Sequence, residues 1–269
     1  MTVRHPTHYP VNFHILSPVH VGAGKELDPF SYVIANNELC IIDLAEWMAA
    51  YPERDNLARK MDTDNFASVR SFIAREVNPE EAAVCRIPVH SAKLIADYKK
   101  SIEEVDPRNQ VLVEAMTRNE VKNFAYIPGS SIKGAIRTAI ADRQAKAAGV
   151  KPANRHDYNK EIFGPATKDP MRGLKISDVS LGDRGTAIVE AREFPLNEAK
   201  GLTPKGHKEA ALSLCQTTGN VVSNLRLSLA EFTLQGQKIT PEFLLETLNS
   251  FYIEKYIEEY EKFYNIDRA

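Results

Sequence analysis

The sequence of 269 residues is long enough to bury a sizeable core, either in one elaborated domain or in two small ones. Hydrophobic residues make up 43% of the chain and charged residues 26%, and no apolar run approaches the roughly 20 residues of a membrane-spanning helix, which excludes that class of protein. The formal charge of −2 excludes a protein that binds nucleic acid through a uniformly basic surface, so any such site has to be local.

The N-terminal region predicts one strand and one glycine-containing loop. Residues 1–10 lack the apolar core of a secretory signal, so a soluble, cytoplasmic protein is expected. Residues 11–15 alternate apolar and polar side chains, the pattern of a strand with one buried face. Gly22 and Gly24 then allow a close backbone approach or a nest of amide groups. His20, beside them, is either a general base, a phosphate donor or a histidine bonded to the backbone at a strand end.

The region that follows predicts a hairpin and a series of further elements. Two short β-rich runs, residues 31–34 and 38–42, flank Asn36 and Asn37, a pair that tolerates the left-handed backbone of a hairpin turn. Asp43 is placed to cap the helix that comes next. Helical periodicity continues at residues 66–77 and 91–100, and strands are expected at residues 110–116 and 121–127.

A turn and a helix start are predicted in residues 126–137, Tyr-Ile-Pro-Gly-Ser-Ser-Ile-Lys-Gly-Ala-Ile-Arg. Apolar residues recur at helical spacing after the Pro-Gly turn, and the two serines are placed to cap the helix. The amides of a helix N-terminus, two hydroxyls and two cations one turn apart predict a site for an anion. The residues concerned are Gly129, Ser130, Ser131, Lys133, Gly134 and Arg137.

Two catalytic motifs come close to this segment and are excluded by their residue order. A nucleotide-binding P-loop needs lysine after its second glycine, whereas Lys133 precedes Gly134. A hydrolase nucleophile elbow needs glycine at the position that Lys133 occupies. A capped surface helix with solvated basic residues would show the same pattern as an anion site. Against this alternative, Lys133 and Arg137 are like charges that destabilise a helix by roughly 0.2–0.5 kcal/mol, which a bound phosphate would reverse.

Charge is segregated along the chain in a way that the net value hides. Residues 118–160 hold nine basic and three acidic residues, whereas residues 237–269 hold four basic and seven acidic ones. One segment can therefore meet phosphate while the other faces water or a protein. Thr240 and Pro241 predict the start of a helix that runs to about residue 264. Its many aromatic residues indicate that part of it packs on another subunit.

Loops and strands alternate between these two segments. Strands are expected near residues 174–179, 187–194 and 221–234, polar loops at residues 145–159 and 200–208, and a tight hydrophobic turn at residues 162–165.

Motifs for metal and covalent chemistry do not occur in the sequence. Cys40, Cys85 and Cys215 stand far apart, with no C-x-x-C pair, and are expected to be reduced packing residues. There is no H-E-x-x-H motif and no spaced cluster of histidine and cysteine, and the His-Asp pair at residues 156–157 is expected to be solvated. Asp178 is either a lone carboxylate ligand, a strand end or the partner of a base. The sequence thus predicts no catalytic residue, no metal ligand and no cofactor.

Three motifs, in this order, resemble the RAMP superfamily of CRISPR proteins. They are Leu-Ser-Pro-Val-His-Val-Gly-Ala-Gly at residues 16–24, the Tyr-Ile-Pro-Gly segment extended to residues 126–140, and Ile-Phe-Gly at residues 162–164 ahead of Leu-Lys-Ile-Ser-Asp at residues 174–178. Within the superfamily, the hairpin at residues 32–43 is similar to that of the fifth subunit of type III-A, or Csm, effector complexes.

The resemblance implies an α+β fold with a ferredoxin-like, RRM-like RAMP core in β-α-β-β-α-β order. Residues 1–25 and 126–269 would form this core, and residues 26–125 a large mixed α/β insertion. The core strands would be residues 11–16 and the runs near 174 and 187, and its helices residues 131–147 and the aromatic C-terminal helix at 240–264. Family members usually continue into a further strand, whereas this sequence ends at Ala269. The final strand is either missing, in a short or truncated form, or supplied differently.

The resemblance also implies a non-catalytic subunit that caps the 3′ end of the CRISPR RNA and aids its maturation or protection in antiviral defence. Its partners would be the CRISPR RNA, the neighbouring backbone subunit, other subunits of the type III-A complex and a processing nuclease, with no membrane. The two glycine-containing segments are expected to meet on one RNA backbone. The expected RNA-binding residues are His20, Gly22, Gly24, Lys25, Gly129, Ser130, Ser131, Lys133, Gly134 and Arg137.

Two alternatives to this function stay open. Some members of the superfamily cleave CRISPR RNA precursors with a histidine, so the chain could be an endoribonuclease that uses His20. A protein adaptor without RNA affinity of its own would also fit, because the C-terminal helix is acidic and aromatic.

Overall fold

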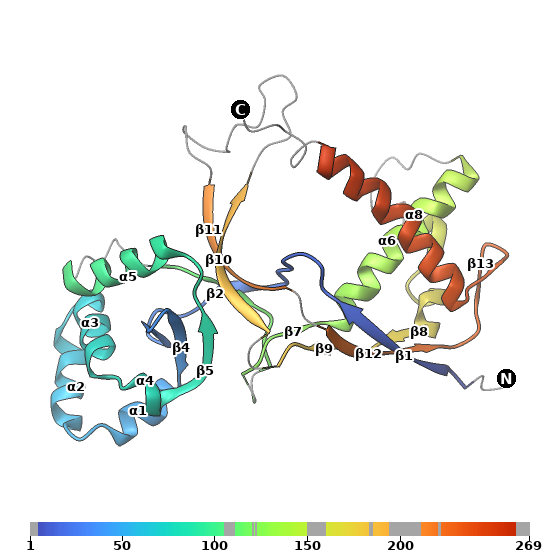
Figure 1. The fold of residues 1–269 in the computed structure, drawn as a ribbon. Helices are drawn as coiled ribbons and strands as arrows, with labels where there is room; N and C mark the ends of the chain where they lie inside the picture. Colours follow the sequence, from blue (N-terminus) through green and yellow to red (C-terminus); the bar gives the residue numbers. More distant parts are fainter. Residues whose placement is uncertain are drawn as a thin grey trace. The chain divides into compact units, whose positions relative to one another are not determined.

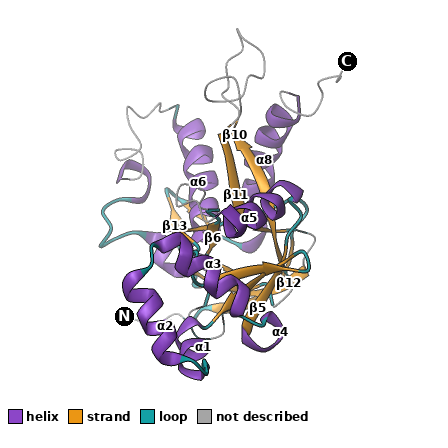
Figure 2. Cartoon of the chain, turned by 90° about the vertical axis from the view of Figure 1, so that its left-hand side faces the viewer, coloured by secondary structure: helices purple, strands orange, loops and turns teal. Residues whose placement is uncertain are grey.

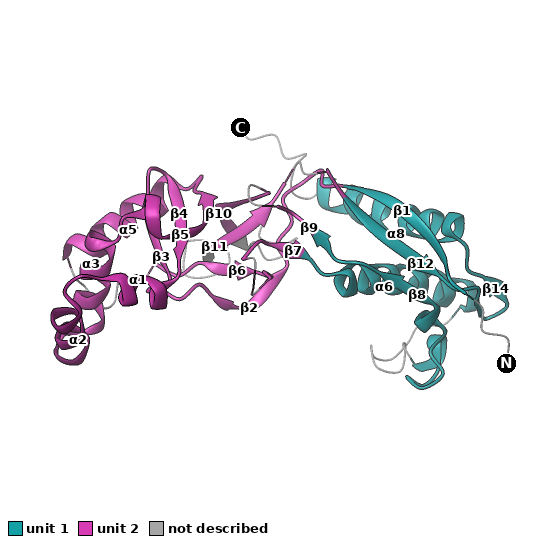
Figure 3. Ribbon diagram, turned by 90° about the horizontal axis from the view of Figure 1, so that it is seen from below, with its two compact units in different colours: residues 1–13, 127–179, 224–269 teal, residues 14–126, 180–223 magenta. Residues whose placement is uncertain are grey.

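The computed structural model describes residues 5–104, 111–119, 121, 123–149, 160–182, 185–193, 211–219 and 222–261. The chain divides into two compact units (Figure 3), of which unit 1 comprises residues 1–13, 127–179 and 224–269, and unit 2 comprises residues 14–126 and 180–223. In the described part of the chain, no helix is long and apolar enough to cross a membrane. The predicted loop at 200–208, most of that at 145–159 with its His-Asp pair, and the end of the predicted C-terminal helix lie outside the described residues.

Unit 1 is built on a three-stranded sheet in the order β1-β12-β8. β1 spans Thr7–His14, β12 spans Val222–Leu229 and β8 spans Leu174–Ile176, with β12 antiparallel to β8. Two long helices, α6 (Gly129–Ala148) and α8 (Pro241–Glu259), lie over one face of this sheet (Figure 1). Its shorter elements include a helical turn at residues 160–163, where part of the tight turn at 162–165 was predicted, together with η1 (Pro170–Gly173), β13 (Thr233–Leu234) and β14 (Gln237–Lys238).

Local sequence explains where the two long helices begin and end. The hydroxyl of Thr240 accepts a hydrogen bond from the Phe243 amide at 3.2 Å, so the predicted cap of α8 is confirmed. α6 ends at Gly149, whose φ of 65° lies in the left-handed region that glycine adopts without strain. Between the helices and the sheet, the described residues form a hydrophobic core, and burial of each large aliphatic side chain in it contributes roughly 1.5–3 kcal/mol. Its members include Ile136, Ile140, Leu174, Leu229, Phe243 and Leu244.

The start of α6 lies directly against the end of β8. Gly129 is buried, and a Cβ added there would overlap the carbonyl oxygen of Ile176 and lie 2.8 Å from that of Ser177. Only glycine fits at this position. The predicted capping by the two serines is wrong, because Pro128 holds the extended backbone of the cap position and the first amide of the helix, that of Gly129, donates to the Asp178 carboxylate instead. Ser130 and Ser131 therefore lie inside the first turn of α6.

Unit 2 contains a four-stranded sheet in the order β10-β11-β6-β2 and a three-stranded sheet in the order β3-β4-β5. The first consists of β10 (Thr186–Glu193), β11 (Ala211–Thr218), β6 (Glu114–Met116) and β2 (Gly22–Glu26), and the second of β3 (Tyr32–Ala35), β4 (Glu38–Ile42) and β5 (Ala83–Pro88). Five helices accompany the second sheet (Figure 2): α1 (Leu44–Ala50), α2 (Arg54–Thr63), α3 (Phe66–Glu76), α4 (Pro79–Ala82) and α5 (Ala92–Glu104). Two short strands, β7 (Tyr126–Ile127) and β9 (Val179–Ser180), lie where the chain passes between the units.

The predicted hairpin and the helix after it are confirmed in unit 2. Asn36 and Asn37 connect β3 to β4 with φ values of 52° and 62°, the left-handed backbone that asparagine tolerates. The Asp43 carboxylate accepts a hydrogen bond from the Glu46 amide at 2.9 Å and caps α1. Alternate residues of β4 enter two different cores, because successive side chains of a strand point to opposite faces. Leu39 and Ile41 pack with α5, whereas Cys40 and Ile42 pack with α3.

Three predicted elements differ from the structure. The strand near residue 187 is not a neighbour of β8: it is β10, which pairs along its whole length with β11, and β12 takes the central place in the sheet of unit 1. The first strand is Thr7–His14, earlier than the predicted 11–16, and the first glycine loop forms β2. Residues 14–25 and 180–223 lie with the predicted insertion in unit 2, because β2 and β11 both hydrogen-bond to β6.

The two glycines of the α6 motif give a test of this packing. We expect Gly129→Ala to lower the free energy of unfolding by about 1–3 kcal/mol, since the methyl group overlaps backbone that cannot move aside. Gly134→Ala should raise it by about 0.5–1 kcal/mol, because an added Cβ meets nothing within 4 Å and alanine is the better helix former. Urea denaturation of both variants measures the difference, and equal effects of the two substitutions would contradict the packing described for Gly129.

Candidate nucleic-acid interface

The N-terminus of α6 holds a carboxylate of the protein itself. The Gly129 amide donates a hydrogen bond to Asp178 Oδ1 at 2.8 Å. A helix N-terminus favours negative charge because its first amides have no partner within the helix. Asp178, for which the sequence left several roles open, thus occupies the position that an anion would take at the first amide.

The two cations of the α6 motif are fixed by neighbouring groups. The Lys133 ammonium donates to the Leu174 carbonyl oxygen at 2.7 Å, and the Arg137 guanidinium lies 2.5 Å from Asp169 Oδ2. The same guanidinium stacks on Phe163 at 3.8 Å from the ring centroid. Both side chains are partly buried. The alternative of freely solvated basic residues is therefore wrong, and the mutual repulsion of the two cations is offset by protein groups rather than left for a ligand.

Burial also changes the chemistry of Lys133. Desolvation lowers its pKa, and the Arg137 and Lys175 cations act in the same direction, whereas the Asp169 carboxylate opposes them. A lowered pKa means that the protonated form is less favourable here than in water. A phosphate bound beside Lys133 would favour that protonated form.

The remaining predicted residues of α6 face solvent. Ser130, Ser131 and Gly134 are exposed on the first turns of the helix. The exposed surface at this helix start therefore consists of hydroxyls and a glycine backbone, with Lys133 and Arg137 partly buried behind it. Such a surface can donate hydrogen bonds to phosphate oxygens without selecting a base.

The second predicted group lies on β2 and in the turn before it, in unit 2. Gly22, Gly24 and Lys25 are exposed and line a hollow of about 510 Å³ together with His20 and Glu114. Gly24 needs to be glycine because its φ is 72°. At Gly22, a Cβ would come within 3.1 Å of His20 Nε2, so a larger residue would press on that ring.

His20 has two partners that the sequence did not reveal. Its Nδ1 lies 2.5 Å from the Gln216 carbonyl oxygen, and its Nε2 lies 3.8 Å from Glu114 Oε2. Because a carbonyl oxygen only accepts, Nδ1 carries the proton and donates. The backbone bond agrees with one of the roles foreseen for His20, and the carboxylate supplies the acid–base partner that was missing from the sequence motif. The two groups of predicted residues belong to different units, so their meeting on one RNA backbone stays a prediction.

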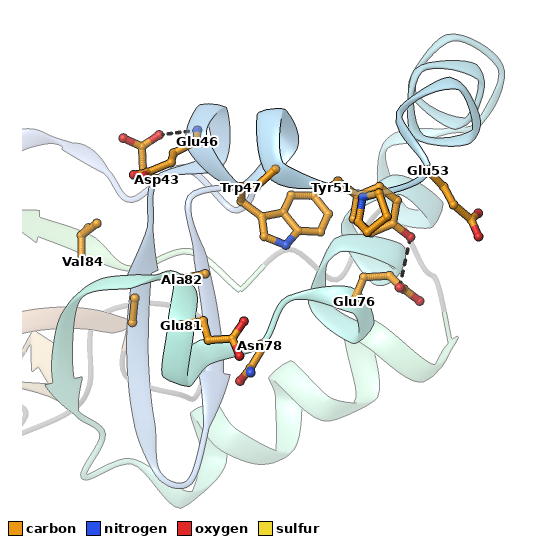
Figure 4. A pocket seen from close by; sticks show the side chains of 13 residues that line it. Asp43, Glu46, Trp47, Tyr51, Glu53, Glu76, Asn78, Glu81, Ala82 and Val84 are labelled. Carbon is orange, nitrogen blue, oxygen red and sulfur yellow. Dashed lines mark hydrogen bonds between the residues drawn. The ribbon is translucent and has the colours of Figure 1, made fainter.

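Unit 2 also has an acidic pocket of about 650 Å³ that sequence reasoning did not single out (Figure 4). Trp47 and Tyr51 lie at its centre, and the Tyr51 hydroxyl donates to Glu76 Oε2 at 3.1 Å. The carboxylates around them would repel phosphate, so this face is unsuited to nucleic acid. The carboxylates that line this pocket are those of Asp43, Glu46, Glu53, Glu76 and Glu81. In the sequence, the acidic residues within 43–53 were the signal that could have indicated this pocket.

Comparisons of this chain with known proteins agree on one family. The sequence model of the RAMP superfamily matches residues 12–265. A Methanocaldococcus jannaschii protein described as CRISPR system Cms protein Csm5 is 28% identical over 187 residues, which is 62% of this chain. The match spans only 42% of that relative's length.

Two solved structures share the fold. A chain in the cryo-EM structure of a Csm–crRNA–target RNA ternary complex of a type III-A CRISPR-Cas system superposes with a TM-score of 0.66 over 95% of this chain and 78% of that one, at 16% identity. The crystal structure of T. onnurineus Csm5 superposes with a TM-score of 0.63 over 96% of this chain and 84% of that one, at 15% identity. Both show a mixed α+β architecture that this chain shares.

The contacts of Arg137 predict a structural effect that is separate from any ligand. We expect Arg137→Ala to lower the free energy of unfolding by about 1–2 kcal/mol, since it removes a partly buried ion pair and a cation–π contact. Lys146→Ala, at the far end of the same helix, is the matched control: its exposed ammonium pairs with Asp142 and Glu254, and its loss should cost at most about 1 kcal/mol. Thermal unfolding of both variants is the measurement, and a smaller effect at Arg137 than at Lys146 would contradict this account.

Proposed function

Since the chain belongs to the RAMP superfamily, we propose that it is a non-catalytic, RNA-binding subunit of a type III-A effector complex that caps the 3′ end of the CRISPR RNA. In this role it aids the maturation or protection of the guide in antiviral defence. The likeness to Csm5 over most of the chain supports the assignment to such a complex. The observation that carries RNA binding is the start of α6, where Lys133 and Arg137 are held in place behind exposed serine hydroxyls.

The order of elements in unit 1 supports a ferredoxin-like RAMP core, with no last strand among the described residues. In chain order it runs β1, α6, β8, β12 and α8. In the sheet, the third strand of this series, β12, lies between the first, β1, and the second, β8. We therefore take unit 1 as the core, and the β10–β11 hairpin as an insertion between the second and third core strands. This core is narrower than the one expected from the sequence.

The proposed mode of binding is to phosphate and not to bases. Ser130 and Ser131 offer hydroxyl donors, Lys133 and Arg137 offer charge, and all four come from two successive turns of one helix. Contacts of this kind fix the register of an RNA without reading its sequence. Lys25, Gly22 and Gly24 of β2 form the second proposed contact, with His20 behind them.

The exposed face of α8 suits a protein partner. Leu245, Ile253 and Tyr256 are each more than half exposed, although they are large and apolar. Exposed apolar side chains that recur along one helix commonly mark an interaction surface. We propose that this face contacts a neighbouring subunit of the complex, whose other subunits and a processing nuclease are the further partners.

The α6 site predicts a loss of RNA affinity on removal of its cations. We expect Lys133→Ala/Arg137→Ala to weaken binding of a CRISPR repeat RNA at least about tenfold, because two charge-assisted hydrogen bonds to phosphate are lost. Affinity decreases as salt increases, and the magnitude of the slope of log affinity against log salt should become smaller by about 0.7 for each phosphate contact removed. Filter binding with the purified chain measures both. Lys99→Ala/Lys100→Ala in α5 removes the same charge from an exposed helix and should change neither.

A second variant separates RNA contact from stability. Ser131→Glu places an acid in the first turn of α6, which stabilises a helix by about 0.3–1 kcal/mol but repels phosphate. The proposal therefore requires lower RNA affinity without lower thermal stability. If both Ser131→Glu and the double variant bind RNA like the wild type with the same salt dependence, the α6 site is wrong and the adaptor alternative gains.

The alternative function, a histidine-dependent endoribonuclease of the RAMP superfamily, is favoured by one observation. His20 Nε2 carries the lone pair of a general base, and Glu114 Oε2, 3.8 Å away, would stabilise the imidazolium that forms when this nitrogen takes a proton. The test is incubation of the chain with labelled repeat RNA in EDTA. We expect the RNA to stay intact; metal-independent cleavage that His20→Ala abolishes would replace the non-catalytic proposal with this one.

A further inference from the structure

Three side chains that can each ligate a metal converge in unit 2. They are His20 before β2, Glu114 on β6 and Cys215 on β11, and one ligand atom from each lies within 4.8 Å of the other two. The closest approaches are 3.2 Å from Cys215 Sγ to Glu114 Oε2 and 3.8 Å from His20 Nε2 to the same oxygen. The sequence predicts no metal ligand because these residues are far apart along the chain and form no spaced motif.

The backbone fixes this convergence. Cys215 is paired with Glu114 in the parallel register of β11 and β6, which places their side chains beside one another on one face of the sheet. His20 is brought to the same point by the residue before it, because Val19 and Thr218 exchange two backbone hydrogen bonds of 2.8 and 2.9 Å. The cluster therefore follows from strand pairing and not only from side-chain rotamers.

The hydrogen bond of His20 prepares its other nitrogen for a cation. Nδ1 donates to the Gln216 carbonyl oxygen, so Nε2 of the neutral ring carries a lone pair. This is the arrangement that metal-ligating histidines adopt, in which a backbone carbonyl fixes the tautomer and the ring orientation. Nε2 lies 3.8 Å from Glu114 Oε2, and the same oxygen accepts a hydrogen bond from the Cys215 thiol at 3.2 Å, so one carboxylate oxygen joins the imidazole and the thiol.

We propose that His20 Nε2, Glu114 Oε2 and Cys215 Sγ bind a zinc ion. One thiolate, one imidazole and one carboxylate form a ligand set that zinc accepts and that magnesium and calcium, which prefer all-oxygen sites, do not. Tetrahedral zinc with its usual bond lengths separates such ligand atoms by about 3.3–3.6 Å. The two separations from Glu114 Oε2, 3.2 and 3.8 Å, are within a few tenths of an ångström of this range, and the third, between His20 and Cys215, is at most 4.8 Å.

The site would be open on one side. Three protein ligands leave a fourth position of the tetrahedron, and His20 and Glu114 both line the hollow of about 510 Å³, which gives room for a water or an exchangeable ligand there. Metal binding releases the thiol proton of Cys215, so a lower pH weakens metal binding. The metal site shares His20 and this hollow with the second proposed RNA contact, whereas none of its evidence comes from the charge or contacts of α6.

Cobalt(II) is the probe for the experiment, since a tetrahedral cobalt–thiolate site has a characteristic absorption and zinc displaces it. We expect the reduced, chelator-treated full chain to bind one equivalent of Co²⁺ with a thiolate charge-transfer band that Zn²⁺ removes. Cys215→Ser should abolish the band. His20→Ala and Glu114→Gln, which change the more accessible ligands, should weaken binding at least about tenfold.

Cys85→Ser is the matched control, because it removes another free thiol of the same unit that lies outside the cluster. It should leave the cobalt spectrum unchanged. A chain that binds neither metal, which is the result expected if His20 and Glu114 share only a proton, overturns the proposal. A thiolate band that persists in Cys215→Ser overturns it as well. Circular dichroism of each variant confirms that a lost signal reflects lost ligands and not an unfolded chain.

Discussion

The close contact between the first turn of α6 and the end of β8 is the constraint on which the rest of unit 1 depends. Because Gly129 has no side chain, the helix can start against the backbone of Ile176 and Ser177. From that fixed start, Lys133 reaches the Leu174 carbonyl one turn later and Arg137 reaches Asp169 two turns later. The apolar residues further along the helix then enter the core shared with α8. The close approach at Gly129 therefore determines how α6 packs, how its N-terminus is capped and where both cations lie.

Elements fixed by neighbouring residues could be predicted from the sequence, whereas strand partners could not. The Asn36-Asn37 turn, the Asp43 cap and the Thr240-Pro241 start all depend on local chemistry, and all three are confirmed. The strand near residue 187 was predicted as a strand, but its partner was wrong. Alternation along a strand reports which face is buried and carries no information on which strand lies beside it, and that choice depends on hydrogen bonds to residues far away in sequence.

The same distinction applies to the candidate site residues. The sequence identified the serines, glycines and cations of α6 as a group, and the helix does present them together. Their partners were not predictable, because Asp169 and Asp178 lie in segments that follow after a long interval and Glu114 meets His20 only through the β2–β6–β11 sheet. The capping role of the serines was wrong because proline at the boundary moved the helix start upstream. In unit 2, the glycine pair was recognised, but as a loop and not as an edge strand.

The stacking of Arg137 on Phe163 has a consequence for conformational entropy. A free arginine loses up to about 2 kcal/mol of rotamer entropy when a ligand immobilises it. Here the ion pair and the ring contact restrict the side chain before any ligand arrives, so that loss is already part of the folding free energy. Lys25, exposed on β2, has no such restriction and must be ordered at the moment of binding. Two side chains of equal charge would thus differ in the enthalpy and entropy of ligand binding. The arginine would be a rigid contact and the lysine an adaptable one.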